Sequence, residues 1–271
     1  MLAAMSEFLI MGPSAEVIDS VERWFELAPP KRGRDHWVDG KSAKELAKAW
    51  FRSGRGALPS ELVALLASPM ATRDAELTVA LAERVTRFDG YGEGRNHDLL
   101  LQMRRDDEAK IIVGIEAKVV ERLDDTVIAK MDEAKRIEGA GKHTNLQRRV
   151  EELVLALFGR TLADVRLGAL RYQMLTAAAG TLVEAKDREA KLAVLVVHDL
   201  SANASDKNAL TPTQMDVSDF VIALGGDGLP MGPGRLYGPF KIAGGGRIPS
   251  NVPLYVGLIE ATERRDPAGG H

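Results

Sequence analysis

Two carboxylates and one amine stand at the ends of two apolar runs, where together they could support metal-dependent hydrolysis. Asp98 precedes the apolar residues 99–101, and Glu116 and Lys118 close the apolar run 111–115. Burying ionised side chains costs on the order of several kcal/mol unless they pair or hold a metal. Strand alternation places Glu116 and Lys118 on one face. If the two strands are neighbours, the three groups converge as in a divalent-metal hydrolytic site.

The elements around these residues favour neighbouring strands. A charged segment, residues 104–108, separates the two runs and predicts a β-hairpin or meander. Residues 192–197 are almost entirely apolar, which predicts a central strand covered on both faces. Residues 254–259 predict a last strand, whereas residues 77–88 are ambiguous between a helix and a strand near 85–88.

Helical patterns precede and follow the hairpin. Helices are predicted over residues 15–27, 42–51, 61–67, 122–138, 144–158 and 167–186. Ser42 and Glu45 have the spacing of a capping box. The pattern predicts an α/β domain with a mixed central sheet over residues 41–271, preceded by an N-terminal helical extension over residues 1–40.

This order of elements resembles the PD-(D/E)XK nuclease superfamily, with its restriction-endonuclease-like fold. The matching residues are Asp98, Glu116 and Lys118, with seventeen residues between the two acids. His97 stands where the family often has a proline. The motif covers about residues 85–120, and a looser likeness extends over roughly 40–200.

The resemblance implies a metal-dependent endonuclease that hydrolyses phosphodiester bonds of nucleic acid, with DNA as the favoured substrate. Asp98, Glu116 and the backbone carbonyl of Ala117 would bind Mg²⁺ or Mn²⁺, which prefer oxygen ligands. Lys118 would orient or deprotonate the attacking water and stabilise charge on the phosphate.

Members of this superfamily often add two further residues. A glutamate from the first helix is matched by Glu45, with Glu61 and Glu76 as rivals; a capping role is an equal alternative for Glu45. A polar residue on the helix after the Glu-x-Lys strand is matched by Gln173. Gln173 and Arg171 would touch phosphate or a metal-bound water, or else cap backbone groups at the sheet edge.

Other chemistry-bearing residues give weaker patterns. None of the five histidines forms a pair at zinc-ligand spacing. Alternation points His97 away from Asp98, which favours a structural role. Glycines at 225–228 and 244–246 indicate turns, although the second group, with Lys241 and Arg247, could form a flap over a substrate.

Composition bounds the class of protein. The 271 residues carry a net charge of −3, are 45% hydrophobic and include no cysteine, which excludes disulfides and thiolate zinc sites and fits a reducing compartment. No apolar run reaches the length of a membrane span. We expect a soluble cytoplasmic protein.

Positive charge is concentrated in two segments. Residues 31–55 hold eight basic and three acidic residues, and residues 130–149 hold six basic and three acidic ones. The segments could form the walls of a phosphate-binding cleft, or they could be solvated helix faces.

Three hypotheses follow. The first is a metal-dependent nuclease, with homodimerisation left open. The second is a catalytically inactive nuclease-fold module that binds nucleic acid or protein. In the third, Glu116 and Lys118 form a strand-end ion pair in an unrelated α/β protein.

Overall fold

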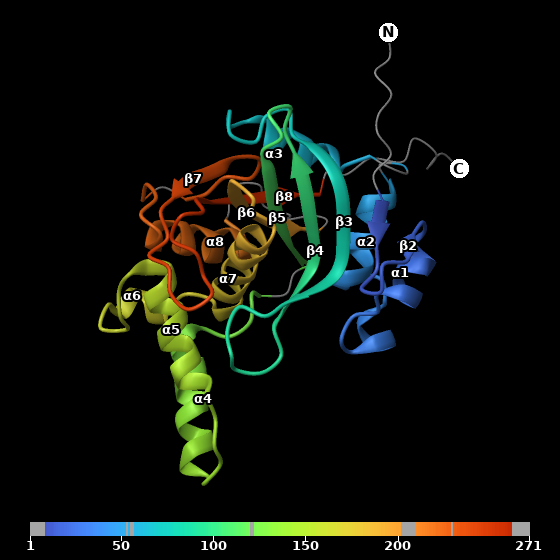
Figure 1. Ribbon diagram of the computed structural model, residues 1–271. Coiled ribbons are helices and arrows are strands. Elements are labelled where there is room, and N and C mark those ends of the chain that lie inside the picture. Colours follow the sequence, from blue (N-terminus) through green and yellow to red (C-terminus); the bar gives the residue numbers. More distant parts are fainter. Residues whose placement is uncertain are drawn as a thin grey trace.

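An eight-stranded mixed sheet forms the middle layer of the computed structural model, which describes residues 9–52, 54, 57–119, 122–201, 210–228 and 230–261 (Figure 1). The strand order is β2-β1-β3-β4-β5-β6-β8-β7. The strands are β1 (Leu9–Met11), β2 (Val17–Ile18), β3 (Glu76–Thr86), β4 (Arg95–Arg104), β5 (Lys110–Lys118), β6 (Leu192–Asp199), β7 (Leu236–Phe240) and β8 (Leu254–Glu260). The predicted α/β class with a mixed sheet is confirmed.

The middle of the sheet joins an antiparallel part to a parallel part. Strands β3, β4 and β5 form an antiparallel meander, so the predicted hairpin between the Asp98 and Glu116 strands is confirmed. Strands β5, β6 and β8 run parallel. The parallel step from β5 to β6 requires a crossover, and the helices α4 to α7 provide it.

Helices cover both faces of the sheet. The helices are α1 (Val21–Leu27), α2 (Ser42–Arg52), α3 (Ser60–Ala67), α4 (Val127–Gly139), α5 (Leu146–Phe158), α6 (Val165–Gly168), α7 (Tyr172–Asp187) and α8 (Pro212–Ala223), with a 3₁₀ turn at Gly33–His36. Helices α1, α2 and α3 pack on one face, and α5, α7 and α8 pack on the other.

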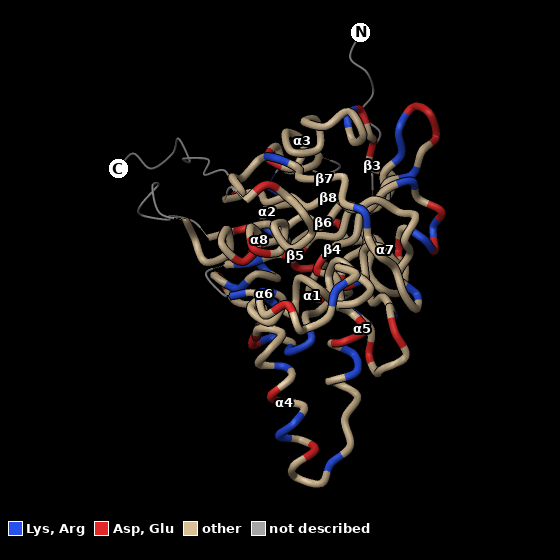
Figure 2. The backbone as a smooth tube through the Cα atoms, turned by 90° about the vertical axis from the view of Figure 1, so that its left-hand side faces the viewer, with Lys and Arg blue, Asp and Glu red and all other residues tan. Residues whose placement is uncertain are grey.

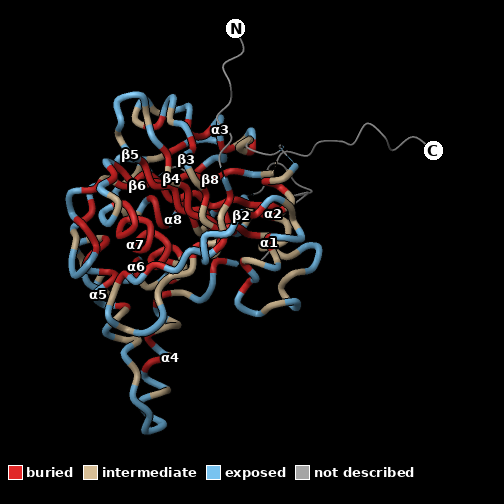
Figure 3. The backbone as a smooth tube through the Cα atoms, turned by 45° about the vertical axis from the view of Figure 1, so that its right-hand side comes forward, coloured by how far each residue is buried: buried red, intermediate tan, exposed pale blue. Residues whose placement is uncertain are grey.

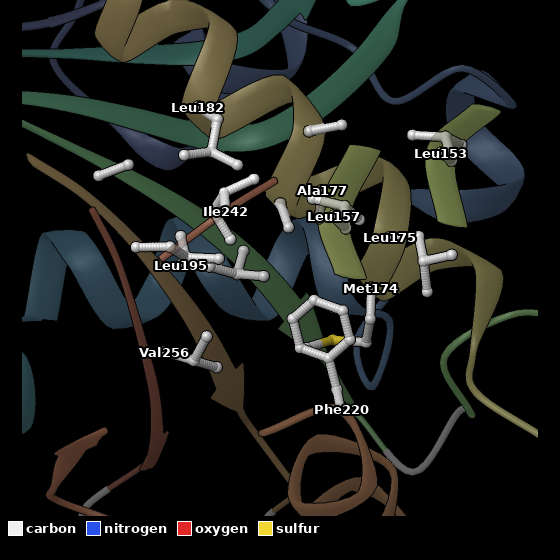
Figure 4. Packing of buried hydrophobic residues seen from close by; sticks show 14 of the residues in the cluster. Leu153, Leu157, Met174, Leu175, Ala177, Leu182, Leu195, Phe220, Ile242 and Val256 are labelled. Carbon is white, nitrogen blue, oxygen red and sulfur yellow. The ribbon is translucent and has the colours of Figure 1, made fainter. Parts of the chain in front are cut away.

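The larger of the two cores lies between the sheet and α7. Leu175 and Leu182 of α7 pack with Leu195 of β6, Val256 of β8 and Phe220 of α8 (Figure 4). Burial is concentrated in the sheet and α7, whereas α4 projects from the body with a mostly exposed or half-buried surface (Figure 3). Acidic and basic residues intersperse along α4 (Figure 2). Among the described residues, no helix is both long and apolar enough to span a membrane.

Two glycines let α7 approach the sheet closely. A methyl group at Gly114 of β5 would lie 2.2 Å from Thr181 Oγ1, and one at Gly180 of α7 would lie 2.7 Å from His97 Nε2. Such overlaps force the helix and the sheet apart. The position of α7 relative to β4 and β5 therefore depends on both glycines.

We expect Gly180→Ala to lower the free energy of unfolding by about 1–3 kcal/mol, because the added methyl group overpacks the helix–sheet contact. Gly139→Ala is the matched control, since nothing lies within 4 Å of a methyl group there. Urea denaturation measures both. Equal stability of the two variants would contradict the close packing at Gly180.

Several predicted elements differ in their bounds. The ambiguous segment 77–88 is strand up to Thr86, and the helix predicted over 167–186 is divided into α6 and α7. The N-terminal extension is only partly helical: residues 9–18 contribute β1 and β2 to the sheet, and α1 begins after its N-cap Ser20. The first eight residues lie outside the described part.

Candidate active site

Strand alternation reverses at Asp98. Leu99 packs in the core on the α2 side, and strict alternation would send His97 to the same side. Instead, the His97 ring and the Arg95 side chain lie against Gly180 of α7. Across the ladder, Glu83 of β3 has a φ of +52°, a conformation that is uncommon for a non-glycine residue. Both strands therefore change face at this point.

At the end of the β4–β5 ladder, Asp98 bonds to β5 through its side chain instead of its backbone. The pair Leu99 and Ile115 closes the ladder at this end. Asp98 Oδ2 then accepts a hydrogen bond of 2.8 Å from the backbone N–H of Ala117, in place of a backbone acceptor. Because the N–H and C=O of one strand residue point to the same side, the Ala117 carbonyl faces this gap as well.

Glu116 is the centre of a buried charge cluster. The residue is 2% exposed, and its Oε1 lies 3.0 Å from Lys118 Nζ. Gln173 Nε2 donates to the same oxygen, while Arg95 pairs with Oε2. Two cations and an amide thus compensate the burial of one carboxylate.

Gln173 owes its position to the start of α7. The helix has sixteen residues and begins at Tyr172, so Gln173 lies in its first turn. The positive end of the helix dipole is directed toward the negative charge of Glu116. The structure brings Gln173 together with Asp98, Glu116 and Lys118.

Arg171 serves to anchor this end of α7. Its Nε donates to Asp216 Oδ1 of α8 at 2.9 Å, and its NH1 donates to the Asp124 carbonyl at 3.3 Å. Of the two open interpretations for this residue, the structure favours the bonding of backbone and neighbouring side chains over contact with a phosphate.

The structure does not bring Glu45 to the cluster. Glu45 Oε1 accepts from Gly40 N at 3.0 Å and from Lys48 at 2.9 Å. It therefore bonds the backbone just before α2, but not as the predicted capping box, because Ser42 is already the first residue of the helix. Its rivals are also elsewhere, since Glu61 lies 3.4 Å from His198 and Glu76 is exposed at the far end of β3. No helical glutamate among the described residues joins the cluster.

A basic cleft of about 740 Å³ opens beside the cluster. Gln173 and Arg95, which hold Glu116, form part of its wall. Both sequence segments that are rich in basic residues contribute to this cleft, the first through Lys31 and Arg32 and the second through Arg149. In the described part of the chain, its lining is Lys31, Arg32, His36, Phe88, Gly94, Arg95, Asn96, Arg122, Asp124, Arg149, Tyr172, Gln173 and Thr176.

Other residues of the two basic segments have local ion-pair partners. Lys44 and Lys48 pair with Asp39 at 2.9 and 2.5 Å, and Lys130 pairs with Asp125 at 3.3 Å. Lys31 and Arg149, which line the cleft, also have acidic partners: Lys31 pairs with Glu93 and Arg149 with Asp89, both at 2.6 Å. The cleft therefore receives Lys31, Arg32 and His36 from the first segment and Arg149 from the second, and its role in binding phosphate stays a prediction.

Comparison with known proteins defines the family. A family model described as "Domain of unknown function (DUF6946)" matches residues 17–263. The chain belongs to the DUF6946 family. No curated protein matches the chain, and no solved structure matches it. All four clustered residues of this DUF6946 member, Asp98, Glu116, Lys118 and Gln173, lie inside the matched region.

Three residues of the DUF6946 site, Glu83, Asn96 and Arg95, were not predicted from the sequence. Asn96 Nδ2 donates to Glu83, and burial together with the charge of Asp98 raises the pKa of Glu83 to about 8. Arg95, the partner of Glu116, is the third. In the sequence, Glu83 lies within residues 77–88, and Arg95 and Asn96 stand directly before His97. Because residues 77–88 were ambiguous between a helix and a strand, the pattern did not place Glu83 beside these two residues.

Because the pKa of Glu83 is raised, we expect the free energy of unfolding to fall as the pH rises. The carboxyl is protonated in the folded state and ionised in the unfolded state between pH 4.5 and about 8, so ionisation favours unfolding in that window. His97 opposes this below pH 6.5, because burial lowers its pKa to about 3. The window from 6.5 to 8 therefore isolates Glu83.

Between pH 6.5 and 8 the free energy of unfolding should fall by about 2 kcal/mol, at roughly 1.4 kcal/mol per pH unit. Urea denaturation in EDTA measures the fall. Glu83→Gln should flatten the profile, whereas the exposed Glu76→Gln should leave it as in the wild type. A wild-type profile that is already flat would contradict a proton on Glu83.

The site contains oxygen donors of the kind that Mg²⁺ and Mn²⁺ take. Asp98 and Glu116 offer carboxylate oxygens from adjoining strand ends, and the Ala117 carbonyl faces the same gap. Burial and then the charge of Asp98 raise the pKa of Glu83 to about 8, against the hydrogen bond from Asn96 and the charge of Arg95, which lower it. Among the described residues, no group of three or more His, Asp or Glu side chains could hold a metal, so a metal here would depend on the two carboxylates and the backbone.

Proposed function

We propose that this DUF6946 protein is a metal-dependent nuclease with a restriction-endonuclease-like core, which hydrolyses phosphodiester bonds of nucleic acid, with DNA as the favoured substrate. The observation that carries the proposal is the convergence of Asp98, Glu116, Lys118 and Gln173 beside a basic cleft. Carboxylates for a metal, an amine for a proton and cations for phosphates are the groups that this reaction needs.

Each residue of the cluster has a distinct role in this proposal. Asp98, Glu116 and the Ala117 carbonyl hold the metal. Lys118 orients the attacking water, takes or relays its proton, and neutralises charge that develops on the phosphate. Gln173 fixes the Glu116 carboxylate through its amide N–H. The chemistry that Mg²⁺ or Mn²⁺ supplies when bound is activation of water and neutralisation of phosphate charge.

The cleft supplies the affinity for the substrate backbone. Its arginines and Lys31 neutralise phosphates and release counterions, which makes binding salt-dependent. Among the described residues, Asp124 is the one acid in the lining. The cleft therefore suits a polyanion even though the whole chain is acidic.

We expect Arg122→Ala to lower the slope of log K against log salt by about one, because one phosphate contact is lost. Fluorescence anisotropy with a labelled DNA duplex in EDTA measures the slope. Arg104→Ala is the control, since Arg104 lies at the far end of β4 and pairs with Glu108 at 3.1 Å. An unchanged slope for Arg122→Ala would remove this residue from the interface.

The activity itself is tested with plasmid DNA, linear DNA and RNA, each with Mg²⁺, Mn²⁺ or EDTA. Metal-dependent cleavage of any of the three supports a nuclease, and the substrate that is cut most rapidly assigns its class. Binding of nucleic acid without cleavage under every condition would contradict catalysis.

One observation favours the second candidate, a catalytically inactive module that binds nucleic acid. The Arg95 guanidinium is paired with Glu116 Oε2, where a metal would need an oxygen. If the protein is a nuclease, Arg95 must release Glu116 Oε2 so that this oxygen can bind the metal. In an inactive module, Arg95 stays paired with Glu116. Mn²⁺ binding that is unaffected by Glu116→Gln, together with intact DNA binding, would favour the module.

A further inference from the structure

A second cavity, of about 560 Å³, adjoins the basic cleft. The two cavities share Phe88 and Arg149 in their walls. We call this second cavity the side pocket. Its lining is Phe88, Asp89, Gly90, Tyr91, Arg149, Glu152, Leu153, Leu155, Ala156, Gly244, Gly245, Gly246, Arg247 and Ile248. Three segments far apart in the sequence thus enclose it: the β3–β4 loop, α5 and the glycine-rich loop after β7.

The side pocket has apolar walls suited to a flat ring. Phe88, Leu153, Ala156 and Ile248 are buried hydrophobic residues in its lining. The Arg149 guanidinium lies over the Phe88 ring, 4.7 Å from the centroid. A cation stacked on an aromatic ring therefore stands at the junction of the two cavities, where both residues line the cleft and the pocket.

Fixed hydrogen-bond acceptors stand at the rim. Asp89 Oδ2 accepts from Arg149 Nε at 2.6 Å, and its Oδ1 accepts from Tyr91 N at 2.9 Å. Glu152 Oε1 accepts from Tyr91 OH at 2.8 Å and from Arg148 Nε at 2.9 Å. These carboxylates keep lone pairs for a further donor, such as the amino group of a nucleobase.

The glycine-rich loop closes the third side without filling the space. Gly244 N donates to the Ala156 carbonyl at 2.8 Å, and Gly245 and Ile248 exchange two backbone hydrogen bonds. Gly244 and Gly246 have positive φ values, +80° and +56°, which suit glycine. The loop therefore adds backbone but no side chain at these three positions, and a planar group can approach closely.

We propose that the side pocket receives one unpaired nucleobase of the strand whose phosphates lie in the basic cleft. The substrate class is then single-stranded or locally unpaired nucleic acid. This inference rests on the proposed function, because the phosphate cleft supplies the neighbouring backbone. A base that stays paired in a duplex cannot enter a pocket bounded by Phe88, Arg149 and the glycine-rich loop.

The test compares the affinities of three labelled probes of equal length by fluorescence anisotropy in EDTA. The probes are a single strand, a duplex, and a deoxyribose-phosphate chain without bases. We expect the wild type to bind the single strand about tenfold or more tightly than the base-free chain, as for base stacking at other single-strand sites, and more tightly than the duplex. Equal affinities for the single strand and the base-free chain would overturn the inference.

A blocking variant localises the effect. Leu155 is 53% exposed and lines the pocket, so Leu155→Trp should obstruct it and reduce the preference for bases to about twofold or less. Val63→Trp, at a 49% exposed position of α3 outside the pocket, should retain the preference. A full preference in Leu155→Trp would overturn the assignment to this pocket.

The failure of this inference differs from the failure of the proposed function. If none of the three probes binds, both fall together. If the wild type binds all three with equal affinity and a steep salt dependence, the phosphate cleft stands and only the base pocket falls.

Discussion

Replacing Lys118 by alanine should lower metal-dependent cleavage by about 10²- to 10⁴-fold, the range for loss of a positioned proton donor or of charge stabilisation. Lys118 Nζ lies 3.0 Å from Glu116 Oε1, and its side chain is 11% exposed. Initial rates with saturating Mn²⁺, at concentrations matched for folded protein, measure the effect.

Lys44→Ala is the matched control for this variant. Lys44 is also largely buried, with a side chain 25% exposed, and pairs with Asp39 at 2.9 Å, but it does not line the cleft. Its loss should leave the cleavage rate unchanged. A Lys118→Ala protein that cleaves at the wild-type rate would show that another group handles the proton.

Glu116→Gln should destabilise the protein by about 3–5 kcal/mol and abolish Mn²⁺ binding. The substitution leaves Arg95 and Lys118 close together without their shared carboxylate, and breaking a buried ion pair from one side has a cost of this size. It also removes one of the two carboxylates available to the metal. Urea denaturation measures the first effect, and isothermal titration with Mn²⁺ measures the second.

Glu184→Gln separates the two effects. Glu184 of α7 is a buried carboxylate between two arginines, Arg84 at 3.0 Å and Arg188 at 2.9 Å, and it is 2% exposed, as is Glu116. We expect a similar loss of stability with Mn²⁺ binding retained. If both variants lose Mn²⁺ binding, the effect follows from destabilisation; if neither does, the metal lies elsewhere.

The sequence was sufficient to predict the residues that come together from β4, β5 and α7. Asp98, Glu116 and Lys118 are charges beside long apolar runs, where burial makes an unpaired polar group expensive, so their type and place in the pattern carry the information. Gln173, in contrast, was a candidate only through the resemblance to the superfamily.

The residues that were not predicted depend on backbone geometry and helix packing, which the pattern of apolar and polar residues does not show. Strict alternation predicts the wrong face for His97, because β4 changes face at Asp98 and its neighbour β3 changes face at Glu83. The left-handed residue at this point is Glu83. Arg95 reaches Glu116 only after that reversal. Glu45 was a candidate because of its helix, yet the helix packs on the opposite face from α7. Helix α8 was also missed, although Thr211 and Gln214 form its capping box and Pro212 is its first residue.

The most direct test of the proposed nuclease is the rate at which plasmid DNA is relaxed as a function of Mn²⁺ concentration, for the wild type, Glu116→Gln and Glu184→Gln at equal folded concentrations. We expect metal-dependent relaxation by the wild type and by Glu184→Gln, and none by Glu116→Gln. Relaxation by Glu116→Gln at the wild-type rate would contradict a catalytic centre at Asp98, Glu116 and Lys118.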